Sequence, residues 1–126
     1  MQTHNPKNNY TNQKYQLKSP AKINLILKVL NKRTDNYHNI LSLIHKIELH
    51  DIITIEKSDT LNVICIPDIN IKQSDNIVFK AAKALNNYTN NNFNAKITIN
   101  KKIPIGAGLG GGSSNAATTL FLLNQF

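Results

Sequence analysis

Alternating apolar and polar positions dominate the first two thirds of the chain and predict strands. Ile23, Leu25, Leu27 and Val29 fall on one face of an extended segment, because side chains of a strand point to alternate sides. Residues 51–57, 61–66 and 95–100 alternate or are rich in β-branched side chains, so each also predicts a strand. Residues 39–49 fit either a strand or a helix, while 31–37 read as a charged turn.

Two segments show helical spacing. After a capping Ser74 or Asp75 the apolar residues are Ile77, Val78, Ala81, Ala82 and Leu85, and after Ser113 they are Ala116, Ala117, Leu120 and Leu123. The Asn-rich tract 86–94 is expected to end the first helix. No Gly or Pro ends the second before Phe126, which would suit a sequence that stops early. The predicted order of elements is several strands, a helix, a strand, the glycine-rich loop and a helix. This order predicts an α+β fold of two layers.

Composition narrows the function classes only slightly. A single Cys among 126 residues excludes an internal disulfide framework and a cysteine-based zinc site. No apolar run reaches the roughly 18 residues of a membrane span, and the polar N-terminus is not a secretory signal, so a cytoplasmic protein is expected. Residues 1–16 are predicted to be a disordered polar leader, and 17–126 a single domain.

The charge of +8 attracts anions without choosing among them. Lysines are dispersed from Lys7 to Lys102 and are not interleaved with aromatic residues, which argues against a nucleic-acid partner. The histidines form no metal-ligand cluster, so no metal-binding residues are predicted. Cys65, between two isoleucines, is expected to be a buried core thiol.

The strongest feature is Pro104–Ser114, because all five glycines of the chain lie between Gly106 and Gly112. A glycine-rich loop that opens a helix predicts a phosphate site, since its N–H groups can converge on an anion. A Walker A loop does not fit, because Gly112 stands where its Lys belongs. The G-x-G-x-x-G pattern of dinucleotide-binding oxidoreductases does match at Gly106, Gly108 and Gly111, so that alternative stays open.

The loop resembles the ATP loop of the galactokinase, homoserine kinase and mevalonate kinase superfamily. Pro20-Ala21-Lys22-Ile23-Asn24-Leu25 is similar to that superfamily's first strand, and Asp35-Asn36-Tyr37-His38 resembles an Asp-Gly-Tyr-His turn of some members. Together with Gly110–Ala117, these motifs narrow the resemblance to the kinases of the non-mevalonate isoprenoid pathway that act on cytidine diphosphate-linked methylerythritol. The resemblance implies the N-terminal ATP-binding domain of such a kinase over residues 17–126.

The resemblance also implies roles for individual residues. Lys22 would be the catalytic lysine, and Asn24, Tyr37 and His38 would bind the substrate. ATP, with Mg²⁺ as its companion, would be held by Pro104, Ile105, Gly106, Ala107, Gly108, Leu109, Gly110, Gly111, Gly112, Ser113 and Ser114. The reaction would be phosphorylation of the substrate's 2-hydroxyl.

One expected part of the kinase is missing from the sequence. Members of the superfamily carry an acidic general base in a Gly-Ala-Asp segment after the ATP-loop helix, and no such segment occurs here. A positioned base is typically worth about 10²–10⁴-fold in rate, so the chain alone is expected to be inactive. It would be either half of a split enzyme, with a separately encoded C-terminal half, or a non-catalytic nucleotide-binding remnant.

Overall fold

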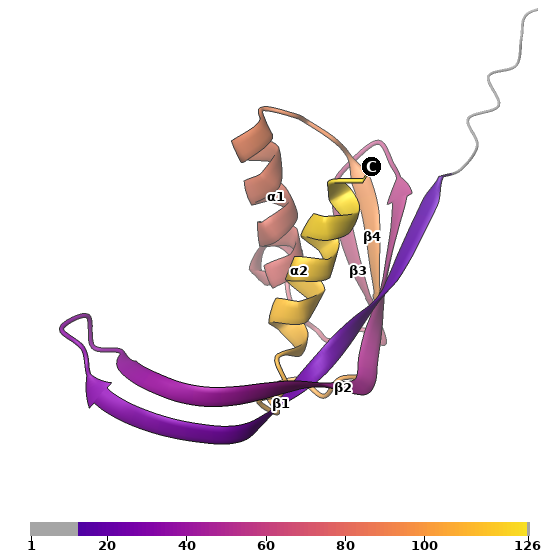
Figure 1. Ribbon diagram of the computed structural model, residues 1–126. Helices are drawn as coiled ribbons and strands as arrows, with labels where there is room; N and C mark the ends of the chain where they lie inside the picture. Colours follow the sequence, from indigo (N-terminus) through magenta and orange to yellow (C-terminus); the bar gives the residue numbers. More distant parts are fainter. Residues whose placement is uncertain (1–12, 126) are drawn as a thin grey trace, which may run out of the picture.

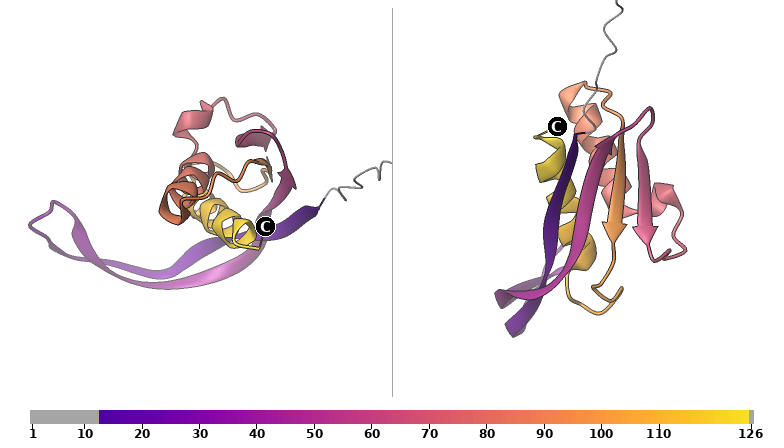
Figure 2. Two further views of the ribbon diagram at one scale, coloured as in Figure 1. Left: turned by 90° about the horizontal axis from the view of Figure 1, so that it is seen from above. Right: turned by 90° about the vertical axis from the view of Figure 1, so that its right-hand side faces the viewer.

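The computed structural model describes residues 13–125 as one sheet with two helices packed on one of its faces (Figures 1 and 2). The strands are β1 (Lys14–Lys32), β2 (His38–Lys57), β3 (Asn62–Ile66) and β4 (Ala95–Asn100), arranged in the order β1-β2-β4-β3. The helices are α1 (Ile77–Thr89) and α2 (Gly111–Leu123), preceded by a short 3₁₀ turn, η1 (Gln73–Asp75). The predicted α+β fold of two layers is confirmed.

The core lies between the helices and the part of the sheet where all four strands are present. β2 pairs antiparallel with both neighbours, but only residues 52–57 of it face β4, which pairs in parallel with β3. The side chains buried there are Ile53, Ile55, Val78, Ala82, Ala95, Ile97, Ile99, Leu122 and Leu123. Apolar residues at alternate positions of β2 and β4 therefore meet the apolar faces of α1 and α2.

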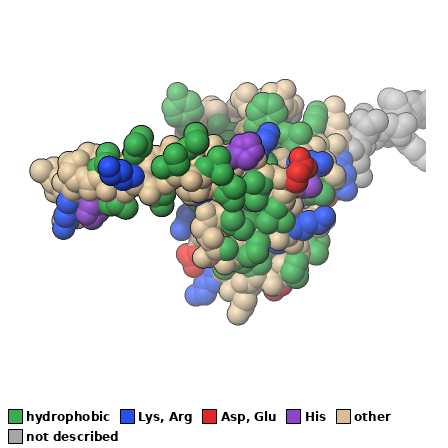
Figure 3. Space-filling model, turned by 60° about the horizontal axis from the view of Figure 1, so that its bottom comes forward, with side chains coloured by type: hydrophobic (Ala, Val, Ile, Leu, Met, Phe, Trp, Pro, Cys, Tyr) green, Lys and Arg blue, Asp and Glu red, His purple; other side chains and the backbone are tan. Residues whose placement is uncertain are grey.

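Beyond this core the first two strands continue as a two-stranded hairpin, which we call the arm (residues 24–44). Figure 1 shows it curving away from the helices, and Figure 3 shows hydrophobic side chains along its protruding surface. Nine large apolar side chains of the arm are 43–61% exposed: Leu25, Ile26, Leu27, Val29, Leu30, Ile40, Leu41, Leu43 and Ile44. Residues 39–49, which fitted either element by pattern, thus belong to a strand.

Several predicted boundaries were wrong by a few residues. Helix α1 is capped by Asn76, whose Oδ1 accepts a hydrogen bond from Val78 N at 2.9 Å, because η1 already occupies the expected cap positions Ser74 and Asp75. Helix α2 begins at Gly111, two residues before Ser113. Strand β1 begins at Lys14, inside the expected leader 1–16, of which residues 1–12 lie outside the described part of the chain.

Neither helix in the described residues is long and apolar enough to cross a bilayer.

Candidate functional site

The glycine-rich segment forms a loop that connects the end of β4 to the start of α2. Gly106, Gly108 and Gly110 have φ angles of 71°, 73° and 69°, a left-handed conformation that is costly for a residue with a Cβ atom. The residues between them, Ala107 and Leu109, keep negative φ angles. Backbone that alternates in this way turns successive N–H groups to one side and forms an anion-binding concavity.

The N-terminus of α2 adds to the same site. Its N-cap is Gly110, which has no side chain, so no cap side chain accepts a hydrogen bond from the first-turn N–H groups. These N–H groups carry the positive end of the helix dipole, which favours a phosphate. The loop and the start of α2 together therefore suit an anionic ligand.

A pocket of about 420 Å³ opens beside the loop. Its lining includes the continuous stretch 104–113 and the apolar side chains of Cys65, Ile71 and Ile77. Lys101 and Asn76 contribute polar groups. The volume is within the usual range for small-molecule sites, and a lining that combines backbone amides with apolar side chains suits a ligand with a phosphate end and a flat apolar end.

Lys22 lies against the loop from the side of β1. Its backbone N–H donates to Leu109 O at 2.9 Å, and its side chain covers Gly110, where an added Cβ would come within 3.1 Å of Lys22 Cγ. Its Nζ donates to Asn24 Oδ1 at 2.5 Å. None of the four ion pairs found within residues 13–125 involves Lys22. Its positive charge therefore stands beside the anion site without a carboxylate to neutralise it.

Asn24 is held in place by a serine that the sequence analysis missed. Asn24 Nδ2 donates to Ser42 Oγ at 2.6 Å, and Ser42 Oγ donates to Ile26 O at 3.0 Å. The side chain of Asn24 therefore accepts from Lys22 and donates to β2, so its orientation is fixed from both sides. Only the pairing of the two strands places Ser42 here, since nothing in its local sequence marks it.

Tyr37 and His38 lie at the far end of the arm and not beside Lys22. Lys32 pairs with His38, ten residues along β1 from Lys22, and Tyr37 is 73% exposed. The turn before them is ordered by Asp35, whose Oδ1 accepts from Tyr37 N at 3.1 Å. Asn36 adopts a φ of 68°, the conformation for which glycine is usual at this position of the resembled motif.

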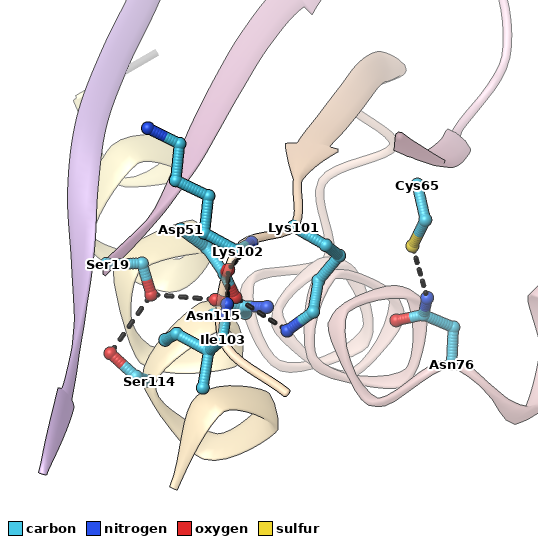
Figure 4. A network of polar contacts seen from close by, with 9 residues as sticks. All are labelled: Ser19, Asp51, Cys65, Asn76, Lys101, Lys102, Ile103, Ser114 and Asn115. Carbon is cyan, nitrogen blue, oxygen red and sulfur yellow. Dashed lines mark hydrogen bonds and ion pairs between the residues drawn. The ribbon is translucent and has the colours of Figure 1, made fainter. Parts of the chain in front are cut away.

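A buried carboxylate that the sequence analysis also missed fixes the start of the loop (Figure 4). Asp51 Oδ2 lies 2.6 Å from Lys101 Nζ, and its Oδ1 accepts from Lys102 N at 2.6 Å and Ile103 N at 2.8 Å. Burial alone would raise the pKa of Asp51. The hydrogen bonds from Ile103, Lys101, Lys102 and Asn115 outweigh burial and lower that pKa below its ordinary value.

The two serines at the start of α2 have different surroundings. Ser113 lines the pocket, whereas the hydroxyl of Ser114 lies 3.0 Å from Ser19 Oγ on β1. Ser19 Oγ also donates to Asn115 Oδ1 at 2.8 Å, and both Ser19 and Asn115 are buried. This contact ties the first turn of α2 to the sheet (Figure 4).

Cys65 was expected to be a buried core thiol, but it is only partly buried and packs against the edge of the core. It lies in β3, at the edge of the sheet, where one flank is open. Burial raises the pKa of its thiol, although Asn76 Nδ2 donates to Sγ at 3.6 Å. The Cys65 side chain also forms part of the pocket lining.

Comparison with known proteins shows what this chain is similar to. Residues 76–126 match the family model described as the GHMP kinases N terminal domain. Over this stretch the chain is similar to the N-terminal domain of GHMP kinases. It is 48% identical over 108 residues to a 4-diphosphocytidyl-2-C-methyl-D-erythritol kinase of Thermodesulfovibrio yellowstonii, and 42% identical over 118 residues to that of Colwellia psychrerythraea. These alignments cover 86% and 93% of this chain, but only 37% and 39% of the two relatives.

Solved structures show the same relationship. A crystal structure of 4-(cytidine 5'-diphospho)-2C-methyl-D-erythritol kinase superimposes with a TM-score of 0.76 and 32% identity, over 88% of this chain and 40% of that one. A homoserine kinase from Cytophaga hutchinsonii, 17% identical with a TM-score of 0.63, shares the fold. The matched family model and the named relatives are all kinases, and this similarity favours a kinase over a dinucleotide-binding oxidoreductase.

Proposed function

We propose that this chain is the ATP-binding part of a kinase that phosphorylates the 2-hydroxyl of 4-diphosphocytidyl-2-C-methyl-D-erythritol. The observation that carries the proposal is the contact between Lys22 and the glycine loop, which brings an ammonium without an ion-pair partner to an anion-binding backbone. The names of the relatives at 41–48% identity support the choice of substrate. ATP, when bound, supplies the phosphoryl group that is transferred.

Each part of the site has a task in this proposal. The N–H groups of the loop and of α2 bind and orient the triphosphate, and the apolar wall at Cys65, Ile71 and Ile77 accommodates the base. Lys22 offsets the negative charge that spreads over the transferring group, which is the main demand of phosphoryl transfer. Asn24 holds the Lys22 ammonium toward the loop and offers its amide to the substrate.

No group of three or more His, Cys, Asp or Glu side chains suited to a metal ion occurs among residues 13–125. Mg²⁺ in kinases commonly binds to the phosphates with few protein ligands, and the hydroxyl of Ser113 beside the loop is a ligand type that it accepts. We therefore propose that Mg²⁺ arrives with ATP and is held mainly by its phosphates.

The substrate would extend along the arm. Its reacting alcohol would lie near Lys22 and Asn24, while its cytidine end would meet Tyr37 and His38. A rigid aromatic ring and an imidazole suit a nucleobase, because the first can stack and the second can donate or accept a hydrogen bond. The remaining walls of that site, and the general base, would come from the part of the kinase that this chain does not match in its relatives.

Isothermal titration calorimetry of the 126-residue chain with Mg·ATP and with NAD⁺ tests the proposal. We expect heat of binding with Mg·ATP and none with NAD⁺. Lys22→Met should weaken Mg·ATP binding by roughly 10- to 100-fold, the value of a hydrogen bond to a charged group.

Lys28→Met is the matched control, because Lys28 is exposed on the same strand and its loss changes the net charge equally. It should leave the affinity unchanged. Binding of NAD⁺ without any response to Mg·ATP would overturn the proposal, as would an equal effect of the two lysine variants.

A further inference from the structure

Asp51 and Lys101 differ from the other charged pairs because both of their side chains are buried. Their side chains are 0% and 9% exposed, whereas the other three ion pairs within residues 13–125 join side chains that are all at least 35% exposed. Removing two charges from water is costly and is offset only by good geometry and further hydrogen bonds. Among the described residues, this buried ion pair lies where β4 ends and the glycine loop begins.

The hydrogen bonds of Asp51 determine where the loop begins. Its Oδ1 accepts from the N–H groups of Lys102 and Ile103, the two residues directly before Pro104. The backbone N–H of Lys101 donates to Ile66 O at 2.8 Å, which attaches the same stretch to the end of β3. The backbone that leaves β4 is therefore held to β2 and β3 at three successive residues.

The other end of the loop meets the same group of side chains. An added Cβ at Gly111, the first residue of α2, would lie 3.5 Å from Lys101 Nζ and only 2.9 Å from Ile103 Cγ2. Lys101 Nζ and the Ile103 side chain thus fill the space directly behind the end of the loop. Since Asp51 binds both residues, one carboxylate controls how closely the two ends of the loop approach each other.

We propose that Asp51 is a positioning residue of the glycine loop. By holding Lys101, Lys102 and Ile103 it fixes the separation of the loop's ends, and the loop N–H groups then converge on one triphosphate. The ordering of the loop is inferred from geometry alone, while its use for a triphosphate rests on the proposed function. Asp51 touches no ligand in this role and acts only through the backbone and Lys101.

Hydrogen–deuterium exchange on the ligand-free 126-residue chain tests the ordering. Asp51→Asn should speed exchange in peptides covering residues 102–112 by roughly tenfold or more, because hydrogen bonds to a charged carboxylate are lost. Peptides from β4 and α1 should exchange as before. Glu56→Gln is the matched control: Glu56 lies on the same strand and pairs with Lys14 and Lys96, but at the surface.

Binding of inorganic triphosphate, measured by calorimetry, distinguishes an effect of loop position from an effect of net charge. Both variants raise the net charge by one, and by charge alone Asp51→Asn should bind an anion more tightly. A positioning role predicts the opposite, a loss of roughly tenfold for Asp51→Asn and no change for Glu56→Gln.

The proposal is overturned if Asp51→Asn leaves the loop peptides at the wild-type rate, or if it speeds exchange equally throughout the chain. Should Asp51→Asn fail to fold, Lys101→Met keeps both backbone bonds of Asp51 and breaks only the ion pair. That variant should speed exchange around Gly111 more than at residues 102–103, and a uniform change would again overturn the proposal. If the wild-type chain does not bind triphosphate but its loop responds as expected, the proposed function fails and the positioning role stands.

Discussion

Lys22 illustrates how a common surface residue comes to lie beside a candidate anion site. By itself a lysine between Ala21 and Ile23 is most often solvated. Here its backbone N–H is bonded to Leu109 O, its stem packs over Gly110 and its ammonium is bonded to Asn24. The contacts with Leu109 and Gly110 connect residues almost ninety positions apart in the chain, so only the ordered set of motifs, and not Lys22 alone, could predict them.

Two glycines of this segment, Gly108 and Gly112, predict opposite effects of substitution by Ala on stability. Gly108 has a φ of 73°, so Gly108→Ala should lower the free energy of unfolding by about 1–2 kcal/mol. Gly112 lies in α2 without a positive φ, and an added Cβ would meet Ile77 Cγ2 at an ordinary 3.5 Å. Gly112→Ala should therefore raise the free energy of unfolding by up to about 1 kcal/mol. Urea denaturation measures both changes, and the same sign for both would contradict this account of the loop.

Asp51 makes a prediction for acid stability. Its pKa is below the ordinary value of 3.8 in the folded chain, so the unfolded chain binds more protons as the pH falls. The stabilisation is present above the ordinary pKa and is lost as the pH falls through the folded pKa. Urea denaturation between about pH 6 and pH 3 should show a steeper loss of stability for wild type than for Asp51→Asn. Parallel curves would show that the carboxylate is not stabilised by its contacts.

At the level of elements, the sequence predicted those strands and helices that depend on the local pattern of apolar residues. Alternation placed β4 at residues 95–100, and helical spacing placed the cores of α1 and α2. The cap of α1 was misplaced because Ser74, Asp75 and Asn76 are all good caps, and η1 decides among them. Asp51, Ser19 and Ser42 were missed because each acquires its role from a partner at least 16 residues away.

The arm makes a prediction at the level of elements. Ile26 and Leu43 pair across its two strands and are 57% and 53% exposed, so this ribbon carries an apolar surface that monomers rarely leave open. Replacing both by Thr, which also favours strands, should reduce self-association in sedimentation velocity and change the free energy of unfolding by about 0.5 kcal/mol or less per site.

Ile53→Thr serves as the comparison for the arm variants. Ile53 lies on β2, as Leu43 does, but is fully buried in the core. Its replacement should cost at least about 2 kcal/mol, through a cavity and a buried hydroxyl. If the arm substitutions lower the free energy of unfolding as much as this core substitution does, the two arm side chains are packed and not exposed.

At the scale of the whole molecule, the residues of the proposed nucleotide pocket lie together, whereas the proposed substrate residues lie apart from them. The loop, the start of α2 and the apolar residues line one cavity, and Lys22 packs against the loop at Gly110. The arm carries Tyr37 and His38 away from that region and leaves its apolar side chains uncovered. The chain spans 37–39% of the length of its curated relatives, so the binding half and the transfer reaction are predicted to be separable.

This separation gives the prediction for the whole molecule. A general base must reach the substrate hydroxyl, and the buried carboxylate near the loop, Asp51, is already committed to Lys101 and to two backbone N–H groups. The 126-residue chain should therefore bind Mg·ATP without measurable turnover of 4-diphosphocytidyl-2-C-methyl-D-erythritol, as followed by formation of ADP. Turnover that Lys22→Met abolishes and Lys28→Met preserves would mean that a base is present within this chain. Absence of both turnover and Mg·ATP binding would contradict the proposed pocket itself, because the residues assigned to it all lie within this chain.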